Sequence, residues 1–162
     1  MSGIPLALPP PRLLARRSVG RAWPAKLSPR VIAMLRRCDS ILLATADADG
    51  QPYVQHRGGP PGFIHVLDER TLGFADFAGN AQYTTVDNLA ENPRAFLFLI
   101  DYARGQRVKF VGRARISDDA ALLATLAPPA DYPAIVERVI LFDVVAWSAN
   151  CPQHIPRLVP AN

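Results

Sequence analysis

The chain has 162 residues, 49% of them hydrophobic, which is enough for one domain with a sizeable core but not comfortably for two. The longest purely apolar run, residues 95–100, is far shorter than the ~20 residues that a membrane-spanning helix needs, so we expect a soluble protein with no membrane partner. The net charge of +4 is unevenly placed, because no carboxylate precedes Asp39 whereas eight of the 18 Lys and Arg residues do. The charge therefore predicts a basic arm on a mildly acidic body.

Residues 1–27, rich in Pro and Arg, are predicted to form this arm, with an irregular or weakly helical structure. Such an arm can bind nucleic acid or a membrane surface, or act as a transit peptide. We favour a solvated extension that packs on a partner subunit, so nucleic acid is not an expected ligand. Residues 28–162 are predicted to form a single domain that ends in a C-terminal tail.

After the arm, the pattern predicts a short helix over residues 28–38, because Ser28 is a good N-cap and Pro29 a good first helical residue. From residue 40 the apolar spacing changes to that of strands, separated by turn residues such as Asp49-Gly50. A later helix is expected to begin at Asn80. We expect strands at residues 41–45, 52–57, 63–67, 71–76, 94–102, 106–116 and 138–145, and two further helices at 80–90 and 117–126.

About seven strands, mostly joined by tight turns, indicate a mainly β fold with helical crossovers, either an antiparallel barrel or a sandwich. The connections are too short for a parallel sheet, in which each crossover takes a dozen or more residues. Neither a Gly-x-Gly-x-x-Gly nor a Walker pattern is present, which removes the support for a dinucleotide fold of that type and for a P-loop.

The cysteines and histidines do not form a recognisable metal site. Cys38 and Cys151 lie far apart, and we expect free thiols in a reducing cytoplasm. His56, His65 and His154 are scattered, and Cys151 with His154 supplies only two of the four ligands of a structural zinc site, so no metal is expected. A nucleophilic Cys151–His154 pair would need an orienting third group. We therefore favour a structural or cofactor-covering role for this tail.

The most informative segment is residues 50–63, where a predicted strand carries Gln55, His56 and Arg57 and is followed by Gly58. Glycines let a backbone approach a flat ring while polar side chains reach its edges. A barrel corner also favours glycine, so this segment alone leaves both interpretations open.

Three further segments follow in a set order: residues 71–83, 88–93 and 107–114. They consist of a strand with a polar loop, a helix ending in Asn-Pro, and a hairpin strand with alternating Arg and Lys. In this order they resemble the pyridoxamine 5′-phosphate oxidase-related family of FMN-binding split β-barrels, over about residues 20–158. The tail at residues 146–156, with Cys-Pro-Gln-His-Ile-Pro, is similar to one branch of that family.

The resemblance implies FMN as cofactor and a homodimer in which residues of both chains meet at each cofactor site. Catalytic residues are not assigned, and a rim that selects a small-molecule substrate is expected at Trp147, Cys151 and His154. The implied cofactor contacts are Gln55, His56, Arg57 and Gly58 at one edge of the flavin, Asn80 and Gln82 at its phosphate, and Arg107 and Lys109 from the partner strand.

Two positions depart from the branch: Ala81 replaces an expected arginine, and Ser148 an expected aspartate. Losing one charged hydrogen bond to phosphate weakens binding by about 1.5–3 kcal/mol, or about one to two orders of magnitude in affinity. We therefore expect weak FMN binding.

The functional expectation is an FMN-dependent oxidoreductase of unknown substrate, although pyridoxamine phosphate oxidation itself is not expected. The alternative is a non-enzymatic protein that binds flavin, haem or another small molecule as a carrier or sensor. The alternating Arg107, Lys109, Arg113 and Arg115 fit a solvated strand face as well as a cofactor contact.

Overall fold

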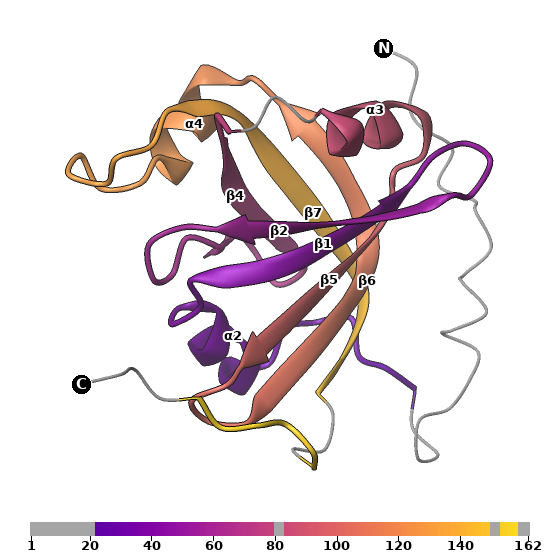
Figure 1. The fold of residues 1–162 in the computed structure, drawn as a ribbon, viewed down its shortest axis with the longest axis vertical. Coiled ribbons are helices and arrows are strands. Elements are labelled where there is room, and N and C mark those ends of the chain that lie inside the picture. The colour runs from indigo at the N-terminus through magenta and orange to yellow at the C-terminus, as the bar shows by residue number, and fades with distance from the viewer. Residues whose placement is uncertain (1–21, 80–82, 150–152, 159–162) are drawn as a thin grey trace.

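The structure is a computed structural model that describes residues 22–79, 83–149 and 153–158. Within these residues the strands form one antiparallel sheet in the order β2-β1-β5-β6-β7-β4-β3, which curls into an open barrel (Figure 1). The strands are β1 Ser40–Ala46, β2 Pro52–Gly58, β3 His65–Val66, β4 Thr71–Phe77, β5 Arg94–Asp101, β6 Gln106–Ser117 and β7 Val136–Ala149. The helices are α2 Pro29–Leu35, α3 Thr84–Glu91 and α4 Ala120–Leu126.

The barrel interior is built from strands with alternating burial. Leu43 of β1 and Leu97 of β5 are fully buried and directly opposite each other, whereas their strand neighbours face outward. Phe74, Phe110 and Phe142 are also fully buried and contribute the largest side chains of the core. This alternation is the strand period expected from the sequence, and it confirms the predicted mainly β fold with helical crossovers.

A seam separates β2 from β4, because these strands lie far apart in the sheet order and no ladder joins them. Arg57 of β2 and Asp76 of β4 form an ion pair across this seam. Side chains rather than backbone hydrogen bonds therefore connect the two strands there.

The helices lie at the two ends of the barrel: α3 and α4 at one end, α2 at the other (Figure 1). The predicted cap of α2 is present, because Ser28 Oγ accepts a hydrogen bond from the amide of Val31 at 3.3 Å. This helix ends at Leu35, and tighter turns with i−3 hydrogen bonds follow up to Cys38. No described helix combines the length and the apolar character needed to cross a bilayer.

Several predicted boundaries were wrong. The strand expected at residues 63–67 is reduced to β3, His65–Val66. The helix expected from Asn80 begins at Thr84, because the Tyr83 carbonyl accepts the amides that close the first turn; residues 80–82 lie outside the described part. The helix expected from Ser117 begins at Ala120, because β6 runs through Ser117 and Asp119 caps the helix. The last strand is longer than predicted, since β7 pairs with both β4 and β6.

Residues 24–27 of the predicted arm contact the barrel. The backbone and indole N–H groups of Trp147 donate to the carbonyls of Pro24 and Lys26, at 2.9 and 2.8 Å. The amide of Leu27 donates to the carbonyl of Glu69 at 2.9 Å, and the Leu27 side chain is buried. This part of the arm is therefore attached to β7 and to the turn before β4.

Candidate functional site

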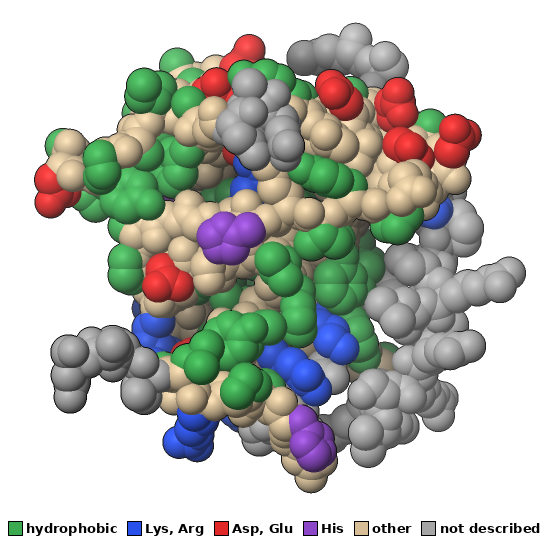
Figure 2. All heavy atoms as spheres, in the orientation of Figure 1, with side chains coloured by type: hydrophobic (Ala, Val, Ile, Leu, Met, Phe, Trp, Pro, Cys, Tyr) green, Lys and Arg blue, Asp and Glu red, His purple; other side chains and the backbone are tan. Residues whose placement is uncertain are grey.

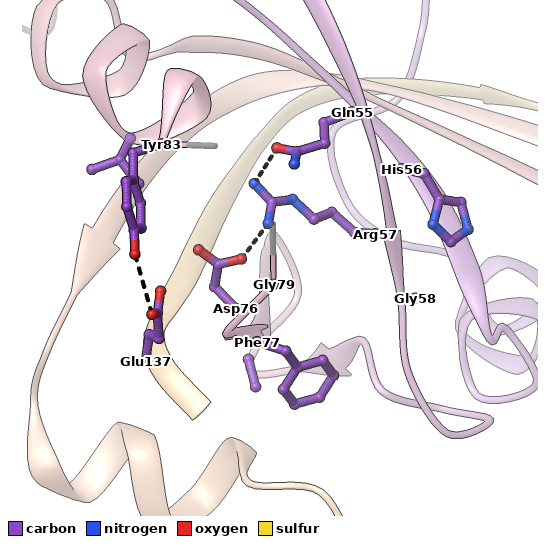
Figure 3. A pocket seen from close by; sticks show the side chains of 11 residues that line it. Gln55, His56, Arg57, Gly58, Asp76, Phe77, Gly79, Tyr83 and Glu137 are labelled. Carbon is purple, nitrogen blue, oxygen red and sulfur yellow. Dashed lines mark hydrogen bonds and ion pairs between the residues drawn. The ribbon is translucent and has the colours of Figure 1, made fainter. Parts of the chain in front are cut away.

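A cleft of about 340 Å³ lies at the seam. It brings together four elements that are distant in sequence: β2, the end of β4, the start of α3 and Glu137 of β7 (Figure 3). Its volume falls within the range of small-molecule sites, roughly 300–1,000 Å³. The residues that line it are Gln55, His56, Arg57, Gly58, Ala75, Asp76, Phe77, Gly79, Tyr83, Val86 and Glu137.

Gln55 and Arg57 are held in the cleft by hydrogen bonds. The Gln55 carboxamide oxygen accepts from Arg57 Nη2 at 2.7 Å and from Thr85 Oγ1 at 2.9 Å. Arg57 Nη1 donates to Asp76. The Arg57 Nε is buried and has no hydrogen-bond partner among the described residues. Because a buried donor without a partner is costly, this N–H is a candidate contact for a bound acceptor.

The charges in the cleft are largely paired. Burial raises the pKa of Asp76, while Arg57 and Arg138 oppose this rise; the Arg138 Nε lies 3.8 Å from the Asp76 carboxylate. Glu137 accepts a hydrogen bond from Arg138 at 2.6 Å and one from the Tyr83 hydroxyl at 3.4 Å. The Arg138 guanidinium also lies over the Tyr83 ring, 5.0 Å from its centroid. Both arginines are thus engaged with carboxylates.

The four residues predicted on β2 all line the cleft, but their side chains do not all enter it. Gln55 and Arg57 point toward Asp76, whereas the exposed His56 lies on the opposite side of the strand (Figure 3). A side chain at Gly58 would bring its Cβ to 3.1 Å from the His56 ring. Asn80, Ala81 and Gln82 lie outside the described residues.

Those of the remaining predicted residues that the structure describes do not line this cleft. Arg107 lines a second pocket with Trp147, and Lys109 lies opposite Phe98 on β5. His154 is exposed, with a φ of 63°, and Cys151 lies outside the described residues. Over the ranges that the structure describes, no three His, Cys, Asp or Glu side chains are grouped as metal ligands would be.

Sequence reasoning missed Asp76 and Glu137, which line the cleft, and Thr85, which donates a hydrogen bond to Gln55. Asp76 had a signal, because it is a carboxylate between Ala75 and Phe77 in an otherwise apolar strand. Thr85 and Glu137 carried no such signal, because polar residues are common at the ends of helices and strands.

A model of the family described as pyridoxamine 5′-phosphate oxidase matches residues 27–151, most of the chain. The chain belongs to this family. No curated protein matches the sequence.

Solved structures similar to this family member have low sequence identity and show the fold alone. HupZ from Group A Streptococcus is 18% identical with a TM-score of 0.60, and the match covers 82% of this chain and 100% of that one. An FMN-binding protein from Syntrophomonas wolfei is 10% identical with a TM-score of 0.57, over 73% and 81%. HutZ, the heme storage protein from Vibrio cholerae, is 15% identical with a TM-score of 0.50, over 76% and 94%. The predicted split-barrel fold is confirmed.

The cleft of this pyridoxamine 5′-phosphate oxidase family member fits the ring of a flavin better than its phosphate. For the ring, the cleft offers two donors: the unpartnered Arg57 Nε and the Gln55 amide nitrogen, which donates to no described residue. It also offers open space at Gly79, where an added Cβ would meet only the Phe77 carbonyl, at 3.9 Å. For the phosphate, the described lining residues include no cation free of a carboxylate.

Proposed function

We propose that this protein binds FMN in the cleft at the seam and is an FMN-dependent oxidoreductase acting on a small molecule. One observation carries the binding part: the buried Arg57 Nε lacks a partner in a cleft where the rest of the guanidinium is fixed by Gln55 and Asp76. A fixed donor that is left unsatisfied by the protein favours a ligand with an acceptor edge.

The chain's own residues bind and orient the ring. Asp76 and Gln55 each accept from Arg57, so the guanidinium cannot rotate away without breaking both contacts. Thr85 donates to Gln55, which couples the start of α3 to β2 and leaves the Gln55 amide nitrogen free to donate. The bound flavin would supply the redox chemistry itself, and the protein supplies orientation and electrostatics.

The FMN phosphate is held by neutral donors in this proposal. Helix N-termini favour anions, and α3 begins at Thr84 beside the cleft, with its Tyr83 N-cap making no side-chain cap bond. Asn80 and Gln82 are added by family resemblance alone. Without a free cation, the affinity is reduced about 10- to 100-fold relative to a site with a charged phosphate contact.

The protein works as a homodimer in this proposal, through an apolar outer face on β2, β1 and β5. The side chains of this outer face are Val54, Leu42, Ala44, Phe96 and Phe98, which strand pairing places side by side. Val54 is 57% exposed and Leu42 36% exposed. Figure 2 shows hydrophobic side chains gathered on this side of the molecule, next to Lys and Arg. Faces of this kind commonly mark protein interfaces.

The dimer is tested by light scattering on two single variants. Val54→Asp introduces a charge in the outer face and is expected to give monomers. Ile135→Asp, at a side chain that is 75% exposed and outside that face, is the control and keeps the mass of the unmodified protein. A Val54→Asp variant that remains dimeric would place the interface elsewhere.

The cofactor is tested by the visible spectrum of the purified protein, before and after incubation with FMN and desalting. Retained flavin at about one per chain supports the cleft, and Gln55→Ala is expected to lose it. Gln51→Ala, at an exposed glutamine just before the same strand, is the control. Flavin retained by Gln55→Ala would exclude this site.

The reaction is tested separately by adding NADH or NADPH to the flavin-loaded protein. Bleaching that reverses in air, with turnover, supports the oxidoreductase. Bound flavin without turnover favours the non-enzymatic carrier or sensor. A haem carrier would instead bind haemin with a Soret shift, although the one described histidine at the cleft, His56, points away from it.

A further inference from the structure

A pocket of about 340 Å³ lies on the outer face of β4. Pro60 and Pro61, in the turn after β2, line one side of it, and Pro128 and Pro129, in the segment after α4, line the other. We propose that this proline pocket binds a small uncharged aromatic molecule that carries one hydroxyl or amide group. None of the residues that the family resemblance implies for the cofactor or for the substrate rim lines it.

Strand alternation places the proline pocket outside the barrel. Phe74 of β4 is fully buried in the core, so its neighbour Ala75 and, two residues further on, Phe77 face outward. In Figure 3 the Phe77 ring points away from Arg57. Ala75 and Phe77 also line the cleft at the seam, but the two cavities share no other lining residue. The end of β4 therefore lies between two separate sites.

Backbone hydrogen bonds fix the wall on the side of β2. The amide of Phe63 donates to the carbonyl of Pro60 at 2.9 Å, and the amide of Gly62 donates to the carbonyl of Cys38 at 2.7 Å. Gly62 has a φ of 83°, a conformation that this turn requires and that favours glycine. This wall is therefore formed before any ligand binds.

The opposite wall is held by side-chain packing. Leu126 is buried in a cluster with Val139 of β7. The amide of Tyr132 donates to the carbonyl of Pro129 at 2.9 Å, and the Tyr132 ring packs on Phe77 with 5.7 Å between the ring centroids. Walls that are already ordered lower the entropic cost of binding, and their proline and phenylalanine rings suit a flat, rigid ligand.

The absence of charge in the lining decides the class of ligand. No Lys, Arg, Asp or Glu side chain is among the lining residues, and His65 is the one that can titrate near neutral pH. Burial lowers the pKa of His65, so its imidazole is neutral at pH 7. An ion in this pocket would lose its hydration without gaining a charged partner. The pocket therefore favours an uncharged molecule.

His65 also supplies the polar contact. Val66 packs against the core, so strand alternation turns the His65 side chain to the outer face and into the pocket. Its imidazole has no hydrogen bond to a described residue. A neutral imidazole offers one donor and one acceptor, which a hydroxyl or an amide group can satisfy.

The probe is 2-naphthol, compared at pH 7 with naphthalene, which lacks the hydroxyl, and with 2-naphthoate, which is charged. Equilibrium dialysis measures the three affinities. We expect 2-naphthol to bind about tenfold or more tightly than 2-naphthoate, because the charge would be desolvated. We expect it to bind about three- to tenfold more tightly than naphthalene, because of the hydrogen bond to His65.

Two variants that add a tryptophan locate the bound probe. Ala127→Trp adds bulk to the lining of the proline pocket at an exposed position, and should weaken 2-naphthol binding about tenfold or more. Val86→Trp is the matched control, because Val86 lines the cleft at the seam and not the proline pocket. It should leave the affinity for 2-naphthol unchanged. The reverse pattern would place the probe in the cleft and overturn the proposal.

Two further variants test the contact with His65. His65→Leu should bind 2-naphthol and naphthalene equally, whereas His65→Gln keeps a hydrogen-bonding group and should restore part of the preference for 2-naphthol. A preference that survives fully in His65→Leu would overturn this contact. A lack of saturable 2-naphthol binding, or equal binding of 2-naphthol and 2-naphthoate, would overturn the pocket. Ala127 is exposed, so its variant gives an answer even if His65→Leu fails to fold.

Discussion

Arg57 on β2 and Asp76 on β4 form an ion pair between two strands that share no backbone hydrogen bonds. Both side chains are largely buried, with 14% and 6% exposure. Burial nevertheless raises the pKa of Asp76, so the two nearby arginines do not fully offset the loss of hydration. The protonated form of Asp76 is therefore favoured more in the folded protein than in the unfolded chain, and such perturbed carboxylates are common at functional sites.

Asp76→Asn removes a titrating group whose pKa is raised in the folded state, so it is expected to change how the free energy of unfolding depends on pH. A pKa raised in the folded state means that the native protein binds the proton more tightly than the unfolded chain. Stability relative to Asp76→Asn then falls as the pH rises from 3.8, the unfolded value, through the raised folded pKa. Urea unfolding from pH 3.5 to pH 7 measures this difference.

Asp68 is the control with the opposite sign. Hydrogen bonds from the Arg70 amide and from Thr71 lower its pKa, so its carboxylate stabilises the fold above 3.8 and loses that effect as the pH falls. Asp68→Asn should therefore lower the free energy of unfolding more at pH 7 than at acidic pH. A difference between the unmodified protein and Asp76→Asn that grows in favour of the unmodified protein as the pH rises from 3.5 to 7 would contradict the expected sign.

Ala81→Arg is expected to tighten FMN binding about 10- to 100-fold, because it restores the phosphate-pairing charge that the family resemblance leads us to expect. Fluorescence titration of FMN measures the change, since free flavin and bound flavin differ in emission. Ala78→Arg adds the same charge at an exposed position before the loop and is the control. Equal effects of the two variants would indicate attraction by net charge alone.

Gly112→Ala is expected to destabilise the fold by about 3 kcal/mol or more, or to prevent folding. Gly112 lies at a register shift between β6 and β7, where an added Cβ would overlap the carbonyl oxygen of Asp143. Gly79→Ala has space for its Cβ and should change stability by no more than about 0.5 kcal/mol. Thermal unfolding compares the two, and similar melting temperatures would refute the packing argument.

Cys38 is expected to be unreactive toward thiol reagents in the folded protein at pH 8. Burial raises its pKa to about 12, although a backbone hydrogen bond with Ser40 opposes the rise. Thiolate is the reactive form, so almost none is present. In Cys151→Ser the single remaining thiol should react with Ellman's reagent only in denaturant, and rapid labelling without denaturant would show that this part of the core opens.

The sequence predicted the sheet well where local chemistry decides the outcome. The strand period around Leu43 and Leu97 and the Ser28-Pro29 cap are local signals, and the structure confirms both. The boundary at Ser117 was wrong because pairing with β7 extends β6 beyond its local pattern, and Asp119 competes as a cap. Long-range strand pairing is not visible in a window of neighbouring residues.

The site was predictable only in part for a related reason. Gln55 to Gly58 stood out as one polar segment on one strand, and the structure places them at one cleft. Their partners Asp76 and Thr85 come from separate elements, and only the closure of the barrel brings them to β2. Strand alternation also turns His56 away from its two neighbours, which residue type alone does not reveal.

The contacts of Trp147 with Pro24 and Lys26 bear on where the arm can be cut. Proteolysis before Trp23 would leave both carbonyl acceptors in place, whereas cleavage after Lys26 would release them and free the indole N–H. Residues from Pro24 onward therefore contact the barrel, which places this boundary earlier than the change in composition at residue 27 suggests. Trp147 emission would report a cleavage after Lys26, because that cleavage frees the indole N–H.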